Sequence, residues 1–258
     1  VERSGNMGYM WGITNTPSLQ SDYEPATKHF LLIGFLAMFC SSIVFAVYCF
    51  KKMDKRQQEN MVFLATAAST LFYYLMWSGF GVMHKLDSEG GTREVFWARY
   101  LDRFVTGPLL LYSLADLCQA ELPEVLMLVS VDFFMTAAAG IGSTELHPWK
   151  WIWWTIGMAF FVVLAIQVFG IVNQAKQAGN PLSYNINILA LLLLLSWLVY
   201  DTVWVLGEEG LGAISISLEV GFVVLADLVS KIAYGLFLIF VVLPQKEEGS
   251  SEEETSLV

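Results

Sequence analysis

The chain contains an uncharged apolar run that is long enough to cross a lipid bilayer. Phe30 to Phe50, FLLIGFLAMFCSSIVFAVYCF, is a stretch of 21 residues without a charged side chain. An α-helix of about 20 apolar residues spans the roughly 30 Å of hydrocarbon in a bilayer. The run lies too far into the chain, and is too long, for a signal peptide. It therefore predicts a membrane-spanning helix.

Six further apolar segments follow, separated by short turns that contain Gly, Pro or charge, such as DSEGGTRE, STELHP, QAGNP and GEEGLG. The hydrophobic content of 56% and the mean hydropathy of +0.57 are typical of a membrane protein and exclude a soluble enzyme. The expected fold class is an all-α membrane protein, a seven-transmembrane-helix bundle. The predicted spans are residues 30–50, 60–83, 96–118, 122–142, 150–173, 184–206 and 214–243.

The charges between the spans predict the orientation of the bundle. The basic cluster KKMDKR, Lys51 to Arg56, follows the first span and belongs on the cytoplasmic side. Seven spans then place the N-terminus outside and the C-terminus in the cytoplasm. We expect an extracellular segment over 1–27, the seven-helix domain over 28–243 and a disordered acidic tail over 244–258. The net charge of −10 owes much to this tail and indicates no nucleic-acid partner.

Metal binding is not indicated by the cysteines or histidines. The cysteines fall within or at the edges of spans without paired spacing, and the histidines stand singly at helix ends or in loops. We therefore expect no metal site.

The charged residues within the spans are the strongest functional signal. Charge in hydrocarbon is costly, so these residues should face the bundle interior, find partners and mark function. Asp227 and Lys231 are spaced i, i+4 in the last span and share one helix face. They form either a structural ion pair or a reactive site. In the second case Lys231 is a desolvated amine that forms a Schiff base with an aldehyde, and Asp227 stabilises the cation.

The third span favours the reactive site. One face of this span carries two cations, an anion and a hydroxyl into the bundle, because Arg99, Asp102, Arg103 and Thr106 lie at i, i+3, i+4 and i+7. A lone structural pair requires none of these groups.

The sixth span adds a stripe of aromatic rings. Trp197, Tyr200 and Trp204 are spaced three and four residues apart and share one face. Such a stripe more often serves packing. Facing a buried lysine, its flat rings would instead clamp a flat conjugated ligand.

In these motifs the chain resembles the microbial (type 1) rhodopsins of the bacteriorhodopsin-like group, along nearly all of its length. The matching motifs are WARY followed by Asp102, Thr106 and Pro108, then Trp197-x-x-Tyr200-x-x-x-Trp204, and finally Asp227-x-x-x-Lys231. The resemblance implies that Lys231 carries all-trans retinal as a protonated Schiff base. It also implies that Asp102 and Asp227 are the counterions and that Arg99 lies beneath them toward the outside.

The resemblance further implies a retinal pocket and an outer proton-release group. Tyr73 falls near the counterions, Asp132 and Met135 fall at pocket positions, and Leu110 stands where leucine accompanies green absorption. Glu209 and Glu219 fall at the two glutamates of the release group, where two carboxylates held together can share one proton. The alternative for Glu209 is a solvated loop charge.

The cytoplasmic proton donor of the family pattern is missing. The triplet of acceptor, threonine and donor reads Asp102, Thr106 and Ser113. A serine hydroxyl does not release a proton near neutral pH, so the proton must come from water or another group. Asp116 is the nearest candidate in the sequence. We expect a slow photocycle.

Two further substitutions place unusual charges near the predicted pocket. Arg103 stands where relatives usually have a tryptophan, and Asp201 where they usually have a proline. Each alone would bury an unpaired charge at a cost of several kcal/mol. Our hypothesis is a buried Arg103–Asp201 salt bridge in or beside the pocket, with Gly107 making room and leaving Asp132 without its usual threonine partner. Alternatively, each charge separately meets water or another group.

The expected function is that of a light-driven outward proton pump. Light would isomerise retinal, the Schiff-base proton would pass to Asp102, Arg99 would swing outward, and Glu209 with Glu219 would release a proton. The expected partners are membrane lipid and the transported proton, and a homo-oligomer is left open.

Other rhodopsin functions are weighed against this pump. A sensory rhodopsin that signals through a transducer protein would fit the missing donor and the acidic tail. A light-gated channel is disfavoured because residues 61–83 contain no acidic side chain. A chloride pump is disfavoured because its anion site requires a neutral residue at position 102.

Overall fold

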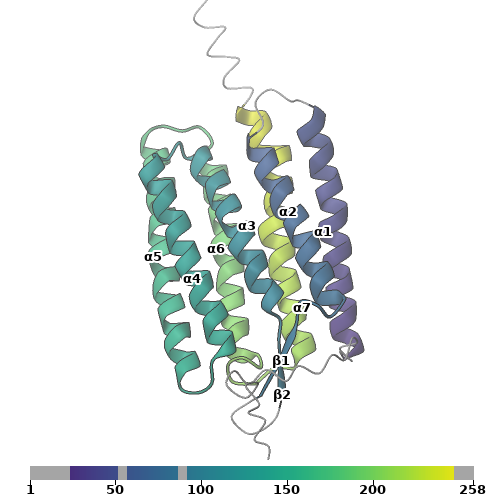
Figure 1. Cartoon of the computed structure of the whole chain (residues 1–258). Coiled ribbons are helices and arrows are strands. Elements are labelled where there is room, and N and C mark those ends of the chain that lie inside the picture. Colours follow the sequence, from purple (N-terminus) through teal and green to yellow (C-terminus); the bar gives the residue numbers. More distant parts are fainter. Residues whose placement is uncertain (1–23, 52–56, 87–91, 247–258) are drawn as a thin grey trace, which may run out of the picture.

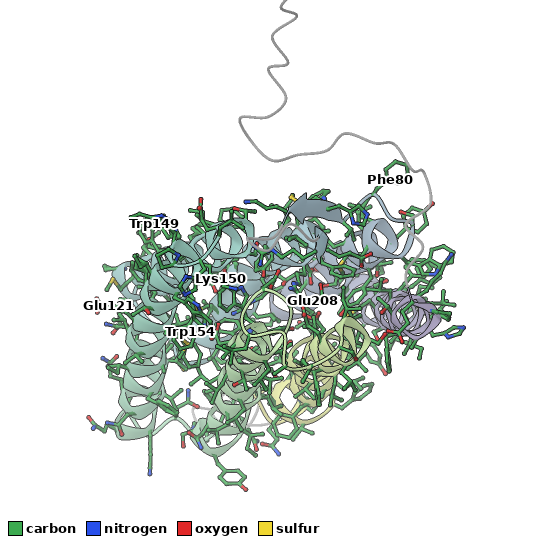
Figure 2. All side chains as sticks on the ribbon, turned by 90° about the horizontal axis from the view of Figure 1, so that it is seen from below. Phe80, Glu121, Trp149, Lys150, Trp154 and Glu208 are labelled. Atoms are coloured by element: carbon green, nitrogen blue, oxygen red, sulfur yellow. The ribbon has the colours of Figure 1, made fainter. Side chains whose placement is uncertain are left out.

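The computed structural model describes residues 24–51, 57–86 and 92–246, and within them seven helical rods form one bundle (Figure 1). The acidic tail, the N-terminal segment up to residue 23 and most of the Lys51–Arg56 cluster lie outside these residues. Figure 2 shows the bundle from below, with Lys150 at the start of the fifth rod and Glu208 in the loop after the sixth. The elements are α1 (Pro25–Lys51), α2 (Gln57–Trp77), β1 (Met83–Leu86), β2 (Thr92–Val95), α3 (Trp97–Leu117), α4 (Leu122–Thr144), α5 (Trp149–Gln177), α6 (Ser183–Leu206), α7 (Ile216–Asp227), η2 (Leu228–Ala233), α8 (Tyr234–Phe237) and η3 (Leu238–Val242).

The outer surface of the bundle is suited to lipid. Large apolar side chains point outward, with Ile166 65% exposed and Leu195 58% exposed. Among the described residues, five helices are long and apolar enough to span a membrane by themselves: Pro25–Phe50, Leu122–Thr144, Trp149–Gln177, Ser183–Leu206 and Ile216–Lys246. The two remaining rods, α2 and α3, bury polar and charged side chains inside the bundle. All seven predicted helices are present.

The second predicted span is wrong at its C-terminal end. The helix ends at Trp77 and is followed by a turn in which Gly79 has φ 86°, a conformation that favours glycine. The last three residues of the segment DSEGGTRE, which was predicted to be a simple turn, lie in β2, and β1 pairs antiparallel with β2, Met83 opposite Val95. The two strands are only four residues each, and the apolar pattern before them continues that of the helix.

A buried arginine attaches this hairpin to the bundle. Arg93 is 6% exposed and donates hydrogen bonds to the carbonyl oxygens of Ser143 (2.9 Å), Glu145 (2.9 Å) and Glu209 (3.4 Å). The first two carbonyls lie at the C-terminal end of α4, where carbonyl groups lack helical partners. We call this end of the bundle the hairpin end.

The seventh rod changes its hydrogen-bonding pattern at the lysine. The α-helical segment α7 passes at Leu228 into the π-helical segment η2, which contains Lys231. A π-helical turn is wider than an α-helical one and often marks a functional site. Asp227, Lys231 and Tyr234 are all buried, at 3%, 2% and 0% exposure, so this rod keeps its polar side chains inside the bundle.

Close packing of the seventh rod yields a test of the fold. A Cβ atom added at Gly235 would lie 2.7 Å from Cζ of Phe45 and would overlap Val62. Gly235→Ala should therefore lower the free energy of unfolding by about 1–3 kcal/mol, measured as a lower thermal midpoint in detergent. Gly170→Ala in α5 is the matched control, because nothing lies within 4 Å of its added Cβ. Equal midpoints for the two variants would contradict this packing.

Candidate functional site

The centre of the site is a buried ion group that joins α3 to the seventh rod. The Lys231 ammonium group contacts the carboxylates of both Asp102 and Asp227. The three side chains are 2%, 3% and 5% exposed. The i, i+4 spacing predicted that Asp227 and Lys231 share a face, and Asp102 meets them from the facing helix.

Hydroxyl groups hold both carboxylates in place. Asp227 accepts hydrogen bonds from Tyr73 (2.7 Å) and Tyr200 (2.5 Å), and Asp102 accepts one from Ser69 (2.6 Å). These bonds compensate for the loss of water around the buried oxygens. Sequence reasoning missed Ser69, although it lies four residues before Tyr73 and therefore on the same face of α2.

Thr106 does not bond the carboxylate of Asp102. Its hydroxyl donates to the main-chain carbonyl of Asp102 (2.9 Å), one helical turn back. The hydroxyl that orients the Asp102 carboxylate therefore comes from Ser69 on α2.

A second ion group lies toward the hairpin end. Arg99 contacts Glu209 and Glu219, each at 2.6 Å. Tyr100 donates to Glu209 (2.7 Å), and the backbone N–H of Glu208 donates to Glu219 (3.1 Å). Glu209 is only 1% exposed, so it is not a solvated loop charge. Arg99 already points toward the hairpin end, where the sequence analysis expected it to swing.

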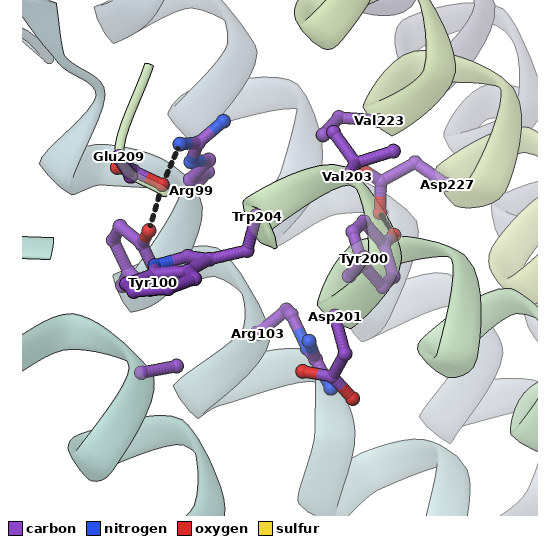
Figure 3. A pocket seen from close by; sticks show the side chains of 11 residues that line it. Arg99, Tyr100, Arg103, Tyr200, Asp201, Val203, Trp204, Glu209, Val223 and Asp227 are labelled. Atoms are coloured by element: carbon purple, nitrogen blue, oxygen red, sulfur yellow. Dashed lines mark hydrogen bonds and ion pairs between the residues drawn. The ribbon is translucent and has the colours of Figure 1, made fainter. Parts of the chain in front are cut away.

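A cavity connects the two ion groups. Its volume is about 30 Å³, and Figure 3 shows Asp227 and Tyr200 on one side of it and Arg99, Tyr100 and Glu209 on another. Carboxylate, hydroxyl and guanidinium groups in its wall could hydrogen-bond to water. The cavity thus links Asp227 of the central ion group to Arg99 and Glu209 at the hairpin end.

The predicted Arg103–Asp201 salt bridge is not formed. The guanidinium group of Arg103 lies over the rings of Tyr200 (4.6 Å) and Trp197 (5.5 Å) instead. Nη2 of Arg103 and Oδ2 of Asp201 are buried without hydrogen-bond partners, although both residues line the cavity (Figure 3).

Gly107 makes room for Asp132. A Cβ added at Gly107 would overlap the Asp132 carboxylate, and both oxygens of that carboxylate are buried without hydrogen-bond partners. The space left by Gly107 therefore accommodates Asp132 and not the predicted salt bridge.

The remaining predicted pocket residues are buried inside the bundle. Leu110, Met135, Trp197 and Tyr200 belong to one buried cluster. Trp204 lines the cavity and packs edge-to-face on Trp151 of α5, with 5.8 Å between ring centres. The predicted aromatic stripe is thus buried in the bundle.

Asp116 lies apart from the site. It is 35% exposed, accepts a hydrogen bond from Gln58 (2.5 Å) and lies 4.0 Å from Lys246. Ser113 is fully buried, with its hydroxyl 3.3 Å from that of Tyr234.

Known proteins resemble the chain over most of its length. A family model described as bacteriorhodopsin-like protein matches residues 25–245. Cruxrhodopsin-3 from Haloarcula vallismortis is 31% identical over 219 residues, which cover 81% of this chain and 87% of that protein.

Two solved structures extend the comparison. The rhodopsin of Coccomyxa subellipsoidea, a light-driven proton pump, has a TM-score of 0.81 at 25% identity and covers 84% of this chain and 97% of its own. Halorhodopsin, a light-driven chloride pump, has a TM-score of 0.80 at 20% identity, covering 87% and 98%, and shows the fold alone. The chain therefore belongs to the bacteriorhodopsin-like family of microbial rhodopsins, which are seven-helix, retinal-binding proteins of membranes.

Proposed function

We propose that this rhodopsin is a light-driven outward proton pump in which Lys231 holds retinal and Asp102 accepts the proton. One observation carries the proposal. The Lys231 amine contacts two carboxylates, and one of them, Asp227, lines a small cavity that reaches the Arg99 group at the hairpin end. A proton that leaves the lysine nitrogen thus has an acceptor in contact and further acidic groups beyond it.

The residues present fit retinal. A buried lysine can form a Schiff base, two carboxylates can balance its positive charge, and the rings of Trp197 and Tyr200 can pack on a polyene. Arg103 is the exception, because its guanidinium group lies over these same rings. When bound, all-trans retinal would supply the light-driven isomerisation that starts proton transfer.

The chain's own groups would then move the proton outward. Asp102 accepts it from the lysine nitrogen, and Ser69 keeps the accepting carboxylate oriented. The transfer neutralises the lysine nitrogen and Asp102 together, so the net charge of the group is unchanged and its remaining negative charge lies on Asp227, which lines the cavity toward Arg99. Arg99, held by Glu209 and Glu219, stabilises the charge left when this pair releases a proton.

The direction of transport rests on the proposed orientation. The end of α1 and the start of α2 lie at the end of the bundle opposite the hairpin (Figure 1). The sequence between them is basic, so the positive-inside rule places the hairpin end outside. Residues 1–27 are then extracellular, 28–243 form the transmembrane domain and 244–258 form the cytoplasmic tail.

The proposal is tested by illuminating cells that express the protein with all-trans retinal. Acidification of an unbuffered suspension, abolished by a protonophore, is the expected result. Pigmented cells that give no pH change would contradict the pump. A sensory rhodopsin would be the next candidate, because Ser113 lacks a proton that it could release near neutral pH.

Asp102→Asn should abolish acidification while the pigment forms. The amide cannot accept the proton, whereas Lys231 and Asp227 still hold and balance the retinal Schiff base. The measurement is the light-induced pH change per pigment, with pigment quantified by absorbance. Lys231→Ala is the control and should form no pigment. Acidification by Asp102→Asn at the rate of the unchanged protein would assign the acceptor elsewhere.

Ser69→Ala should disturb proton transfer more than Thr106→Val. Only Ser69 bonds the Asp102 carboxylate, whereas Thr106 bonds a main-chain carbonyl. We expect Ser69→Ala to shift the dark absorption maximum and to slow acidification, and Thr106→Val to have the smaller effect on both. The reverse order would show that Thr106 orients the acceptor.

A further inference from the structure

Glu59 is a buried carboxyl group that the mechanism above does not use. It lies in the first turn of α2, and its exposure is 5%. The predicted second span began one residue later, so the sequence analysis counted no acidic residue on this helix. The structure begins α2 at Gln57 and places Glu59 among the interior residues of the bundle.

Glu59 lies on the face of α2 that leads to the central ion group. The buried residues Glu59, Val62, Thr66, Ser69 and Tyr73 are spaced three and four apart and form one stripe. At the far end of this stripe, Ser69 bonds Asp102 on α3 and Tyr73 bonds Asp227 on the seventh rod. The stripe therefore faces the interior between α3 and the seventh rod.

Glu59 lies about as far along the bundle from the level of Asp102 as Ser113 does, the position at which the family pattern has its donor. Because Ser69 bonds Asp102, these two residues mark a common level on antiparallel neighbouring helices. At 1.5 Å per residue, Glu59 lies about 15 Å from this level and Ser113 about 16 Å. Asp116 lies about 21 Å away by the same measure, and its side chain is 35% exposed. Glu59 is thus both closer to Lys231 and better shielded from water.

The interior between Glu59 and Lys231 contains buried hydroxyls within an apolar layer. The hydroxyls of Ser113 and Tyr234 lie 3.3 Å apart, and Tyr234 follows Lys231 by three residues. Phe45, Val62 and Leu114 are fully buried in the same half of the bundle. Apolar packing limits the entry of bulk water, whereas hydroxyls can both donate and accept a proton.

We propose that Glu59 is the proton donor on the cytoplasmic side and takes the place of the carboxyl group that Ser113 lacks. In each cycle the Glu59 carboxyl gives one proton to the Lys231 nitrogen, by way of the Ser113 and Tyr234 hydroxyls. It then regains one proton from cytoplasmic water at the start of α2. The proposed donor thus lies on α2, at about the same distance along the bundle as the family's donor position on α3. This inference rests on the proposed pump.

Glu59→Gln is the direct test of this role. Recovery of the dark absorption after a flash should slow by on the order of 100-fold, the usual contribution of a positioned proton donor. Recovery should also slow further as the pH rises, because water must then supply the proton. Glu59→Asp should keep most of the rate, and Glu59→Gln with Ser113→Asp should regain it by restoring a donor on α3.

Asp116→Asn separates the two candidate donors. A larger slowing by Asp116→Asn than by Glu59→Gln would overturn the proposal in favour of Asp116. Unchanged recovery in Glu59→Gln would overturn it in favour of water.

An infrared measurement tests the same group without retinal. In the retinal-free protein in the dark, a carboxylic acid C=O band should be present and should disappear in Glu59→Gln. Absence of this band in the unchanged protein would overturn the proposal. Failure of the pump proposal is recognised separately. In that case, cells with the unchanged protein would give no acidification, whereas the flash and infrared measurements would still report on Glu59.

Discussion

The structure depends on the burial of one ammonium group between two carboxylates. Removing Lys231, Asp102 and Asp227 from water costs several kcal/mol per ion, and mutual attraction offsets this cost only when the remaining oxygens find hydrogen bonds. Ser69, Tyr73 and Tyr200 provide these bonds from α2 and α6. The central group therefore joins α2, α3, α6 and the seventh rod. Lys231 itself lies in the π-helical segment of the seventh rod.

The two halves of the bundle differ in how they surround this group. Toward the hairpin end, the cavity and the Arg99 group continue the polar interior from Asp227 to Glu209. Toward the opposite end, apolar side chains such as Phe45, Val62 and Leu114 are fully buried, and the buried polar side chains include hydroxyls, Gln58 and Glu59. In the proposed pump, a proton released at Lys231 would meet acceptors at once on one side and would be supplied across an apolar layer on the other. Such an asymmetry suits a directional transport cycle.

The sequence predicted those parts of the fold and site that follow from helical periodicity. Seven apolar segments predicted seven rods, and the i, i+4 spacing predicted that Asp227 and Lys231 share a face. Periodicity also predicted that Arg99 and Asp102 face the interior of the bundle. It could not show which groups meet across helices, because such contacts depend on packing.

Four particular residues illustrate that limit. Ser69 is an ordinary small residue of an apolar helix until its contact with Asp102 is seen. Glu59 lies just before the apolar run and was therefore counted outside the span. Arg103 and Asp201 balance in a count of charges, yet Arg103 lies over the rings of Tyr200 and Trp197 and forms no salt bridge with Asp201.

The interior cations are held in two different ways. Lys231 contacts Asp102 and Asp227, and Arg99 contacts Glu209 and Glu219. Arg103 lies instead over the rings of Tyr200 and Trp197. Because charges interact strongly in a low-dielectric interior, a change of charge in the Lys231 group is felt by the Arg99 group. In the proposed pump, this interaction would link proton transfer at Lys231 to release at the hairpin end.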